Sequence, residues 1–404
     1  MRRIGGCLLA VLLLSGCGIS QADVEATRAA GDALATQQAP TAVPTAAPVV
    51  VHLESDGSGE YASLAEAVEA VPEGSTIRLG AGTFLIEPLE IDKPLHLAGA
   101  GIDETVIVSD VGEFVVRYGS SGLFAVEDVA FRYGGSDAAD VVVVQGGEIE
   151  MRRIRFSGAV DVGETQYRAG LRMQGVAAGL VSECVFEEND TVGLYVGGLA
   201  RPTVEWSVAT NNTLVGIHYD GSAGGLAQRN ESSSNQIGIV VAGLAEPALD
   251  WNLCTDNLNG GIVYLDEGGG RATANECLWN GSYGISVMEK AQPTLQGNLC
   301  TDNPVAGIAY FDDAGGTARE NWCWGNTRGI QVGGRAQPTL EQNQSSANDE
   351  MGIVYLDESG GLAYANECLE NGYYGIAVAV TATPNLVDNV AQDNLVEDVH
   401  DERQ

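Results

Sequence analysis

Short runs of alternating apolar and other residues recur along most of the chain. In the Gly-Ile-x-Val and Gly-Ile-x-Tyr segments, Ile239 and Val241, or Ile262 and Tyr264, share one face of an extended strand. These runs are only three to five residues long, and no helical period links them. They predict short β-strands, each of which buries little apolar surface alone and needs neighbouring strands to form a core.

The runs repeat at a fixed interval, which is typical of a solenoid. A Gly followed by Leu or Ile recurs every 22 or 23 residues, at Gly170, Gly193, Gly216, Gly238, Gly261, Gly284, Gly307, Gly329, Gly352 and Gly375. A first asparagine column keeps the same step, at Asn230, Asn252, Asn275, Asn298, Asn321, Asn343, Asn366 and Asn389. A second column lies five residues later, at Asn235, Asn257, Asn280, Asn303, Asn326, Asn348, Asn371 and Asn394. Asparagine tolerates the left-handed backbone of tight turns, and stacked amides can hydrogen-bond from coil to coil.

Small side chains form a further column, two residues after each first-column asparagine. Its members are Ser232, Cys254, Cys277, Cys300, Cys323, Ser345, Cys368 and Ala391. Adjacent parallel strands lie about 4.8 Å apart, slightly beyond the Cβ–Cβ separation of about 3.5–4.5 Å that a disulfide needs. We therefore expect buried, free thiols, with a strained disulfide as the alternative. Cys184 is out of phase with this column.

Alternate coils differ, which gives a second period of 45 or 46 residues. One coil type carries Pro202, Pro247, Pro293, Pro338 and Pro384, and the other carries Asp220, Asp266, Asp312 and Asp357. A β-propeller blade is also about 45 residues long, but the Gly and Asn columns repeat at half that length. Leucine-rich repeats require several leucines per turn, which this chain lacks. A stacked β-helix therefore explains the repeats best.

The chain before Gly170 is less regular. Alternating runs persist there, as from Phe124 to Phe131, so the coils should continue upstream. Residues from Tyr61 to Val71 place Leu64, Ala67, Val68 and Val71 on one face of a short amphipathic helix. Such a helix would cover the open edge of the first coil, which otherwise invites edge-to-edge association.

The composition adds a strong acidic bias, with 55 acidic against 20 basic residues and a formal net charge of -35. Such a surface repels nucleic acid, so no nucleic-acid partner is expected. It also repels anionic lipid heads and polyuronates, unless calcium bridges the two. A solvated acidic surface that keeps the protein soluble is the simplest interpretation.

The first residues have the layout of an export signal, in which Arg2 and Arg3 precede an apolar run. That run ends in Leu-Ser-Gly-Cys17, which closely resembles the bacterial lipobox. The resemblance implies cleavage before Cys17, lipidation of that cysteine, and a protein exported and anchored to the cell envelope, at the cell surface or on a periplasmic face. We expect a lipoprotein signal peptide at 1–16, a flexible tether at 17–49, a β-helix at 50–396 and an acidic tail at 397–404. The membrane is expected to be contacted through the lipid anchor only.

The beginning of the expected β-helix resembles a known group of proteins. Asp56-Gly-Ser-Gly-Glu-Tyr61 precedes the helix, and Thr76-Ile-Arg-Leu79, Gly82-Thr-Phe84 and Ile91-Asp-Lys-Pro-Leu95 follow it. This order is similar to that in pectin methylesterases and other members of the pectin-lyase-like superfamily. The later coils resemble the β-helix repeats of carbohydrate-binding and sugar-hydrolase domains, including NosD-like proteins. The resemblance implies an all-β fold, a single-stranded right-handed parallel β-helix with a short N-terminal capping helix.

The catalytic motifs of that superfamily are absent from this sequence. The paired aspartates of the methylesterases, in their Gln-Asp and Asp-Phe contexts, have no counterpart, and the signatures of calcium-dependent pectate lyases are missing. Fold alone does not determine activity. The sequence therefore assigns no catalytic residue, and His218 with Asp220, two residues apart in one coil, is interpreted as a surface turn, with a catalytic pair as the alternative.

Three acidic pairs recur on alternate coils and should form one row along an edge: Asp266 and Glu267, Asp312 and Asp313, and Asp357 and Glu358. Carboxylate rows can bind Ca²⁺ or the hydroxyls of sugars, and they can equally be solvated loop ends. Trp322 and Trp324 flank the inward Cys323, so both should point outward. Exposed tryptophans suggest a stacking surface for sugar rings, and packing under a neighbouring loop is the alternative.

These observations favour a lipid-anchored binding or structural module for a polysaccharide or cell-envelope glycan. The alternatives are a carbohydrate-active enzyme on the same scaffold, either a polysaccharide lyase or a hydrolase, and a protein-binding solenoid. An enzyme should show an acidic pair with a nearby Arg or Lys in one cleft, whereas a binding module should show a long shallow face. No cofactor other than Ca²⁺ is indicated, and no pattern in the sequence specifies an oligomeric state.

Overall fold

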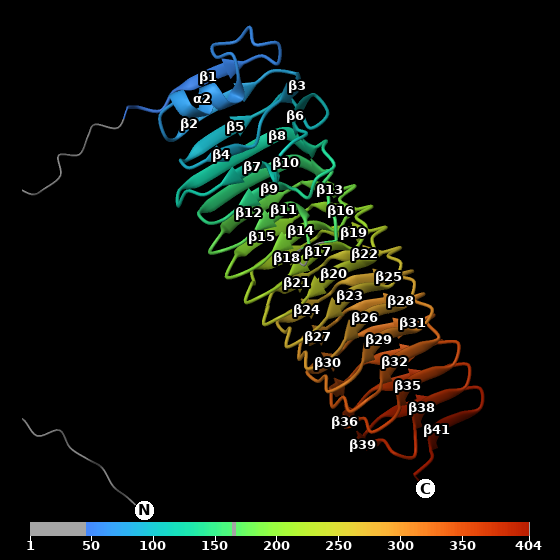
Figure 1. Ribbon diagram of the computed structural model, residues 1–404. Helices are drawn as coiled ribbons and strands as arrows, with labels where there is room; N and C mark the ends of the chain where they lie inside the picture. The colour runs from blue at the N-terminus through green and yellow to red at the C-terminus, as the bar shows by residue number, and fades with distance from the viewer. Residues whose placement is uncertain (1–45, 164–166, 404) are drawn as a thin grey trace, which may run out of the picture. The chain divides into compact units, whose positions relative to one another are not determined.

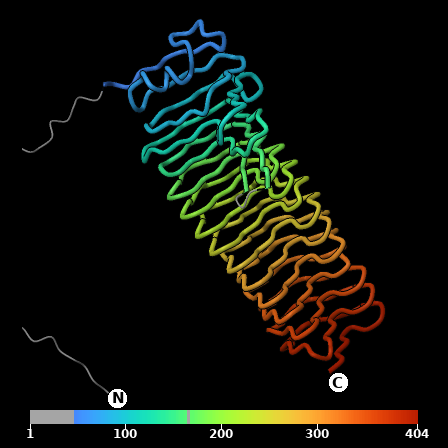
Figure 2. The backbone as a smooth tube through the Cα atoms, viewed as in Figure 1, coloured from blue at the N-terminus to red at the C-terminus, as the bar shows by residue number. Residues whose placement is uncertain are grey.

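A computed structural model describes residues 46–163 and 167–403 of the chain. From Pro48 onward the described chain forms one compact unit in which coils stack along a single axis, from the blue N-terminal end to the red C-terminal end (Figures 1 and 2). Every pairing between named strands is parallel, in one sheet of 27 strands and one of 14. The expected all-β parallel β-helix is thus confirmed.

Each regular coil contributes one strand to each of three faces. The first face consists of β1 (Val50–Leu53), β2 (Ser75–Leu79), β5 (Leu95–Ala98), β8 (Leu123–Tyr133), β10 (Glu148–Ser157), β12 (Ala178–Ser182), β15 (Arg201–Glu205), β18 (Leu226–Gln228), β21 (Ala248–Asp250), β24 (Arg271–Thr273), β27 (Thr294–Gln296), β30 (Thr317–Arg319), β33 (Thr339–Glu341), β36 (Gly360–Tyr364) and β39 (Thr383–Val387).

The second face belongs to the same sheet and shares its long strands β8 and β10. Its own strands are β3 (Gly82–Leu85), β6 (Thr105–Ser109), β13 (Val185–Glu187), β16 (Val208–Thr210), β19 (Glu231–Ser233), β22 (Leu253–Thr255), β25 (Glu276–Leu278), β28 (Leu299–Thr301), β31 (Trp322–Trp324), β34 (Gln344–Ser346), β37 (Glu367–Leu369) and β40 (Val390–Gln392).

The third face is the sheet of 14 strands. It consists of β4 (Leu89–Ile91), β7 (Phe114–Tyr118), β9 (Asp140–Val144), β11 (Ala169–Met173), β14 (Val192–Val196), β17 (Val215–Tyr219), β20 (Ile237–Val241), β23 (Gly260–Tyr264), β26 (Tyr283–Val287), β29 (Ala306–Tyr310), β32 (Arg328–Val332), β35 (Met351–Tyr355), β38 (Tyr374–Val378) and β41 (Glu397–Asp401). Residues 397–401, expected in an acidic tail, form β41 instead because they pair with β38, with Val399 opposite Ile376.

The N-terminal helix exists, and it is shorter at its beginning than expected. Helix α2 runs from Leu64 to Ala70, and Ser63 caps it: its hydroxyl accepts a hydrogen bond from the Glu66 N–H at 3.2 Å. A cap residue of this kind has extended backbone, so the helix begins only after Ser63. The apolar face that the sequence predicts, Leu64, Ala67, Val68 and Val71, is buried in the core.

The two asparagine columns lie inside the turns and are buried. In a typical rung, Asn298 Nδ2 donates to Asn321 Oδ1 at 2.9 Å and to the Ala272 carbonyl at 2.9 Å. The backbone N–H of Asn298 donates to the same Asn321 oxygen at 3.0 Å. Each side chain therefore satisfies polar groups of the neighbouring coils where no water reaches them. The second column begins two coils earlier than expected, at Asn189 and Asn212.

The small-residue column faces the interior opposite the column glycines. All five of its cysteines are free and fully buried, as the spacing predicts. A Cβ on Gly284 would lie 2.6 Å from the Gly307 carbonyl oxygen and 2.9 Å from Cys300 Cβ, so only glycine fits there. Cys184 lies instead at the turn position of Ser207 and Asn230, which explains its different phase.

Candidate functional site

One outward column of the third face carries polar and aromatic side chains on adjacent coils. The second residue after each column glycine points outward, and at most coils it is small or apolar, as at Val240, Val263 and Ala309. On three consecutive coils this position holds Arg172, Tyr195 and His218 instead. The strand register places Arg172 opposite Tyr195 and Tyr195 opposite His218, so the three side chains form a continuous row.

His218 at the end of this row is buried, with only 6% of its surface exposed. Neither ring nitrogen has a hydrogen-bond partner among the residues that the structure describes. The ring meets Tyr195 edge-on, with ring centroids 5.4 Å apart, and Tyr167 at 5.9 Å. Burial lowers the pKa of His218 to about 4, although Asp220 opposes the shift. The imidazole is therefore neutral near pH 7 and able to accept a proton.

Tyr195 differs from His218 in that its pKa is raised rather than lowered. Its hydroxyl donates a hydrogen bond to Asp220 Oδ2 at 2.8 Å. Burial, reinforced by that carboxylate, raises the pKa of Tyr195 to about 12. The phenol therefore keeps its proton, so a neutral base and a protonated donor lie side by side on adjacent coils. Pairs of groups whose pKa values are driven apart are a mark of acid–base sites.

A buried ion pair supports the row at its other end. Arg172 Nε lies 3.0 Å from Asp140 Oδ1, and Arg168 Nη1 lies 3.5 Å from Asp140 Oδ2. The Asp140 carboxylate also accepts a hydrogen bond from the Ala169 N–H at 2.7 Å. Burial raises the pKa of Asp140 although Arg172 opposes that shift. The Arg172 guanidinium lies 4.5 Å from the centre of the Tyr195 ring, so it fixes the plane of the phenol.

A cleft of about 430 Å³ opens over His218. Its floor is apolar, with Val192, Val215 and Val240 among the lining residues, and two carboxylates, Asp220 and Asp266, stand at its edge. Both carboxylates lie against Gly243: Asp266 Oδ2 accepts its N–H at 2.9 Å, and a Cβ there would be 3.0 Å from Asp220 Oδ1. Few, convergent polar groups above an apolar floor are typical of a ligand site.

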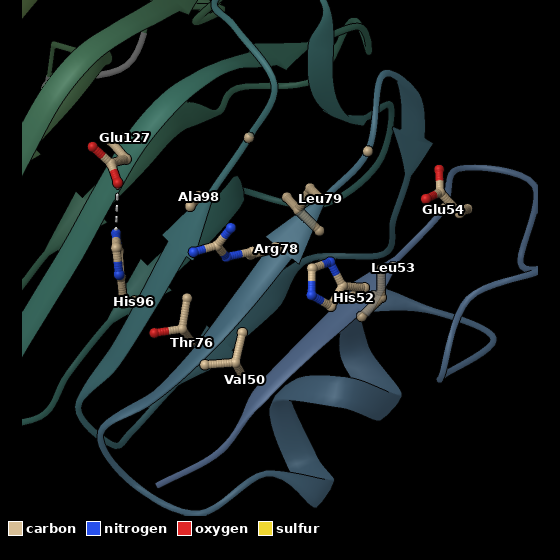
Figure 3. Close-up of a pocket in the computed structure, with 12 residues that line it drawn as sticks. Val50, His52, Leu53, Glu54, Thr76, Arg78, Leu79, His96, Ala98 and Glu127 are labelled. Carbon is tan, nitrogen blue, oxygen red and sulfur yellow. Dashed lines mark ion pairs between the residues drawn. The ribbon is translucent and has the colours of Figure 1, made fainter.

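A second cleft, of about 450 Å³, lies on the first face near the N-terminal end. Figure 3 shows Arg78 in its middle, with His52 to one side and His96 to the other. His96 Nε2 lies 3.2 Å from Glu127 Oε1, and both side chains are about one-third exposed. The cleft thus contains charged groups, but its two histidines are exposed or half-buried, whereas His218 is buried and lacks a hydrogen-bond partner among the described residues. We therefore take the His218 cleft as the candidate site.

The aspartates of the predicted acidic row lie in turns, where their carboxylates accept hydrogen bonds from backbone N–H groups. Asp266, Asp312 and Asp357 all have left-handed backbone, with φ of 55°, 54° and 55°. Asp312 Oδ2 accepts the Glu289 N–H at 3.1 Å, and Asp357 Oδ2 accepts the Gly334 N–H at 3.0 Å. These carboxylates therefore satisfy backbone groups of the preceding coil, as the asparagine columns do elsewhere.

The neighbouring acidic residues differ among themselves. Glu267 and Glu358 are exposed, whereas Asp313 pairs with Arg335, whose Nε lies 2.7 Å from Asp313 Oδ1. That hydrogen bond lowers the pKa of Asp313. Within residues 46–163 and 167–403, no group of three or more His, Cys, Asp or Glu side chains has the arrangement of a metal site. Calcium binding along the row stays a prediction.

Trp322 and Trp324 both point outward, as the spacing predicts, with 55% and 48% of their surfaces exposed. Cys17, the expected lipidation site, lies outside the described residues. Within the described part of the chain, no helix has the length and apolar character that a membrane crossing requires.

The sequence-based interpretation missed Asp140, Arg172 and Tyr195, and it treated His218 and Asp220 as a surface turn. A signal was present in the repeat. Reading only the second residue after each column glycine shows that polar and aromatic side chains occupy three adjacent coils, Arg172, Tyr195 and His218, within a mostly small or apolar column. The repeat does not reveal Asp140, because this residue lies in the irregular region before the 22- or 23-residue period begins.

These features define a right-handed β-helix protein with a cleft on the outer side of one sheet. A family model described as "Right handed beta helix region" matches residues 139–278 and 255–391, and the chain belongs to that family. A comparison with curated protein sequences finds no match.

Among the solved structures that are similar to this chain are those of two epimerases. One is the A-module of the Azotobacter vinelandii mannuronan C-5 epimerase AlgE6, with a TM-score of 0.58 and 18% identity over 82% of this chain and 94% of that chain. The other is the periplasmic alginate epimerase AlgG, with a TM-score of 0.50 and 16% identity over 84% of this chain and 83% of that chain. At these identities the likeness concerns the fold.

Proposed function

We propose that this protein is a carbohydrate-active enzyme that transfers protons at the His218 cleft of a polysaccharide-binding face. The single observation that carries the proposal is the juxtaposition of His218, a buried and neutral base without a hydrogen-bond partner among the described residues, with Tyr195, a protonated phenol. A structural solenoid has no need to bury an unpartnered imidazole, because the lost hydrogen bonds destabilise the fold. The enzyme alternative is thus favoured over a purely binding or structural module.

The substrate class that suits this pair is a polysaccharide containing uronic acids. A neutral imidazole can remove a proton from carbon only where the resulting charge is delocalised, as it is next to a carboxylate. In the proposed step, His218 takes the proton from the carbon that bears the carboxylate. Tyr195 then delivers its proton to the leaving glycosidic oxygen, which completes an elimination from the side of the sugar ring that faces both groups. Arg172 adds positive charge beneath the phenol, which favours the anionic intermediate.

The comparisons support the substrate class by analogy only. The name of the AlgE6 module denotes an enzyme that acts at carbon 5 of mannuronan, and the name of AlgG denotes an alginate epimerase. The acidic surface of this chain opposes a polyanion at long range. Salt screens such repulsion within about 10 Å at 0.1 M, so activity on a polyuronate should rise with ionic strength.

The test measures proton exchange at carbon. The protein is incubated in D₂O with alginate, polygalacturonate and a neutral glucan, and NMR records deuterium entering the polymer while ultraviolet absorbance records unsaturated products. We expect one or both signals with a polyuronate. His218→Gln should reduce the rate about 10²- to 10⁴-fold, the usual contribution of a positioned general base.

His400→Gln is the matched control, because His400 occupies the same outward column opposite Ala377 at the far end of the third face. It should leave the rate unchanged. If one polymer binds but no polymer shows proton exchange or product formation, the protein is a non-catalytic binding module. Equal loss in both histidine variants would assign the effect to the fold rather than to the cleft.

We further propose that the enzyme is exported and anchored to the cell envelope through Cys17. The lipobox-like sequence before Cys17 supports this, together with the Arg-led apolar run ahead of it. Cys17→Ala should move the protein from the membrane fraction to the soluble exported fraction. If the variant stayed with the membranes, the lipid anchor would be excluded.

A further inference from the structure

All five tryptophans of the chain lie at the surface. Their exposed fractions are 55% for Trp206, 63% for Trp251, 59% for Trp279, 55% for Trp322 and 48% for Trp324. Tryptophan is usually well buried, and in this protein the interior is filled by Phe, Tyr, Ile and Val instead. The tryptophans therefore contribute little to the core, and their exposure suggests that they bind a ligand at the surface.

The five side chains border one face. Trp322 and Trp324 are the two outward residues of β31 on the second face, on either side of the buried Cys323. Trp206 and Trp251 lie at the left-handed corners just before β16 and β22, and Trp279 lies at the corner just after β25. We call this surface, the outer side of the second face from Trp206 to Trp324, the tryptophan face.

The tryptophan face spans six consecutive coils, counted along the inward column from Ala209 to Cys323. Parallel strands about 4.8 Å apart make its length about 24 Å. Its outward residues mix apolar and polar groups: Leu253 and Leu299 are half-buried in one column, and Thr255 lies opposite Leu278 in the other. None of its tryptophans lines the His218 cleft, which lies on the third face.

The negative charge of the tryptophan face indicates which kind of ligand it can bind. Glu276 projects outward on β25 between Leu253 and Leu299 in the strand register, and no hydrogen bond or ion pair engages it within the described residues. Asp256 and Asp302 stand at the neighbouring corners. Carboxylates repel anionic glycans, nucleic acids and anionic lipid heads, but they accept hydrogen bonds from hydroxyl groups.

The arrangement of the aromatic rings fits the same ligand. The flat faces of sugar rings carry C–H groups, which pack on the electron-rich face of an indole, while the ring hydroxyls reach polar neighbours. A protein partner would instead need a continuous apolar centre, and here Glu276 and Thr255 interrupt the leucines that lie between the tryptophans. The Arg229 guanidinium already covers Trp206, at 5.1 Å from its ring centre, so four tryptophans remain open.

We propose that the tryptophan face binds an uncharged polysaccharide, with its rings stacked on Trp322 and Trp324 and along Trp279 and Trp251. The site is separate from the His218 cleft and does not depend on the proposed enzymatic activity. It gives the protein a means of attachment to a neutral glycan while the third face stays free.

The experiment titrates the full chain with a mixed-linkage β-glucan, a galactomannan and an α-glucan, with polygalacturonate as the charged comparison. Tryptophan fluorescence and calorimetry report binding. We expect at least one neutral polymer to bind and to shift the emission. The double variant Trp322→Ala/Trp324→Ala should weaken that binding at least about tenfold, because two aromatic anchors are lost. The Trp322→Phe/Trp324→Phe variant retains flat rings and should recover most of the affinity.

Tyr373→Ala is the control, since Tyr373 is an aromatic residue with 52% of its surface exposed that lies outside the tryptophan face, and it should bind as the parent does. Proton exchange at the His218 cleft should be unchanged in all of these variants, so a failure of this proposal is distinguishable from a failure of the proposed enzyme. The proposal is overturned if no neutral polymer binds, if only the polyuronate binds, or if the double alanine variant binds equally well. Loss of self-association in that variant, seen by sedimentation, would identify the face as a contact between copies of this chain instead.

Discussion

The coils before Asn189 and those after it form the same three faces with different side chains. At the corner between the first and second faces, the early coils place Val129 and Ile154, which lie buried inside continuous strands β8 and β10. From β12 and β13 onward the two strands of each coil are separate, with Cys184 and then Ser207 at this position and an asparagine from Asn230 onward. The amide takes over hydrogen bonds that the turn would otherwise leave unmade.

The residue just before this corner forms an ion pair between neighbouring early coils. Arg153 Nε lies 2.6 Å from Asp128 Oδ1, and that hydrogen bond lowers the pKa of Asp128. Both residues have left-handed backbone, as their counterparts do in later coils. Pairs of this kind must be matched coil by coil, whereas an asparagine column is self-complementary. A repeated coil can therefore be duplicated without new partners, and this explains why the later region is regular.

The interiors differ as well. Phe131, Phe156 and Phe186 stack in the early coils, with ring centroids 6.0 and 5.2 Å apart. The same inward column continues with Ala209, Ser232 and the cysteines. The His218 cleft lies where these regions meet, since Arg172 and Tyr195 belong to the first coils of the repeat. Function at a boundary is physically reasonable, because loops of unequal length occur there to build a pocket.

The largest expected effect concerns the aromatic interior. Phe156→Ala should lower the free energy of unfolding by about 3–5 kcal/mol, because it opens a cavity between two stacked rings. Hydrogen exchange should show the loss in the early coils, while amides beyond Asn230 keep their protection. If amide protection is lost uniformly along the chain, the two regions unfold as one unit, which would contradict the distinction between early and later coils.

The next effect concerns the junction and depends on pH. The pKa of His218 is about 4 in the folded protein against an ordinary 6.5, so between these values the unfolded state binds more protons. The neutral histidine therefore contributes stability above pH 6.5 that is lost as the pH falls to about 4, by about 3 kcal/mol in total. His218→Gln should lose this part of the pH dependence in urea titrations at pH 7 and pH 4. If the variant loses as much stability between pH 7 and pH 4 as the parent protein does, His218 is not buried and neutral in the folded state.

A third prediction concerns the regular coils. Asn321→Ala should lower the free energy of unfolding by about 1–3 kcal/mol, because the amides of Asn298 and backbone groups nearby lose a buried partner. Asn389→Ala is the control: Asn389 is only partly buried and donates to no further asparagine, so its loss should be smaller. Thermal unfolding of the two variants measures the difference, and equal shifts would argue against a cooperative column.

The smallest effect concerns the thiol column. Cys300→Ser should change the free energy of unfolding by less than about 1 kcal/mol, because Ser232 and Ser345 already occupy this column and donate to a carbonyl of the same coil. Burial raises the pKa of the Cys300 thiol, so an alkylating reagent should leave it unmodified until the protein unfolds. Rapid labelling of the native protein would show that the interior opens.

Much of the scaffold could be predicted because each coil repeats the same local rules. The period, the turn asparagines, the inward cysteines and the outward Trp322 and Trp324 all follow from positions counted along the chain. The capping helix followed from one apolar stripe, and only its first turn differed because Ser63 caps it. The end of the β-helix was placed too early, since the polar strand β41 has little apolar alternation to reveal it.

The sequence by itself determined the solenoid, its register and the direction in which each repeat residue points, because these depend on spacing alone. The tertiary structure decided which outward side chains meet and in which protonation state. Asp140, Arg172, Tyr195 and His218 come from four coils, and the coil of Asp140 is longer than the repeat, so no fixed spacing predicts its contact with Arg172. The lowered pKa of His218 and the raised pKa of Tyr195 arise from burial under neighbouring coils, and burial is a property of the assembled fold rather than of any segment.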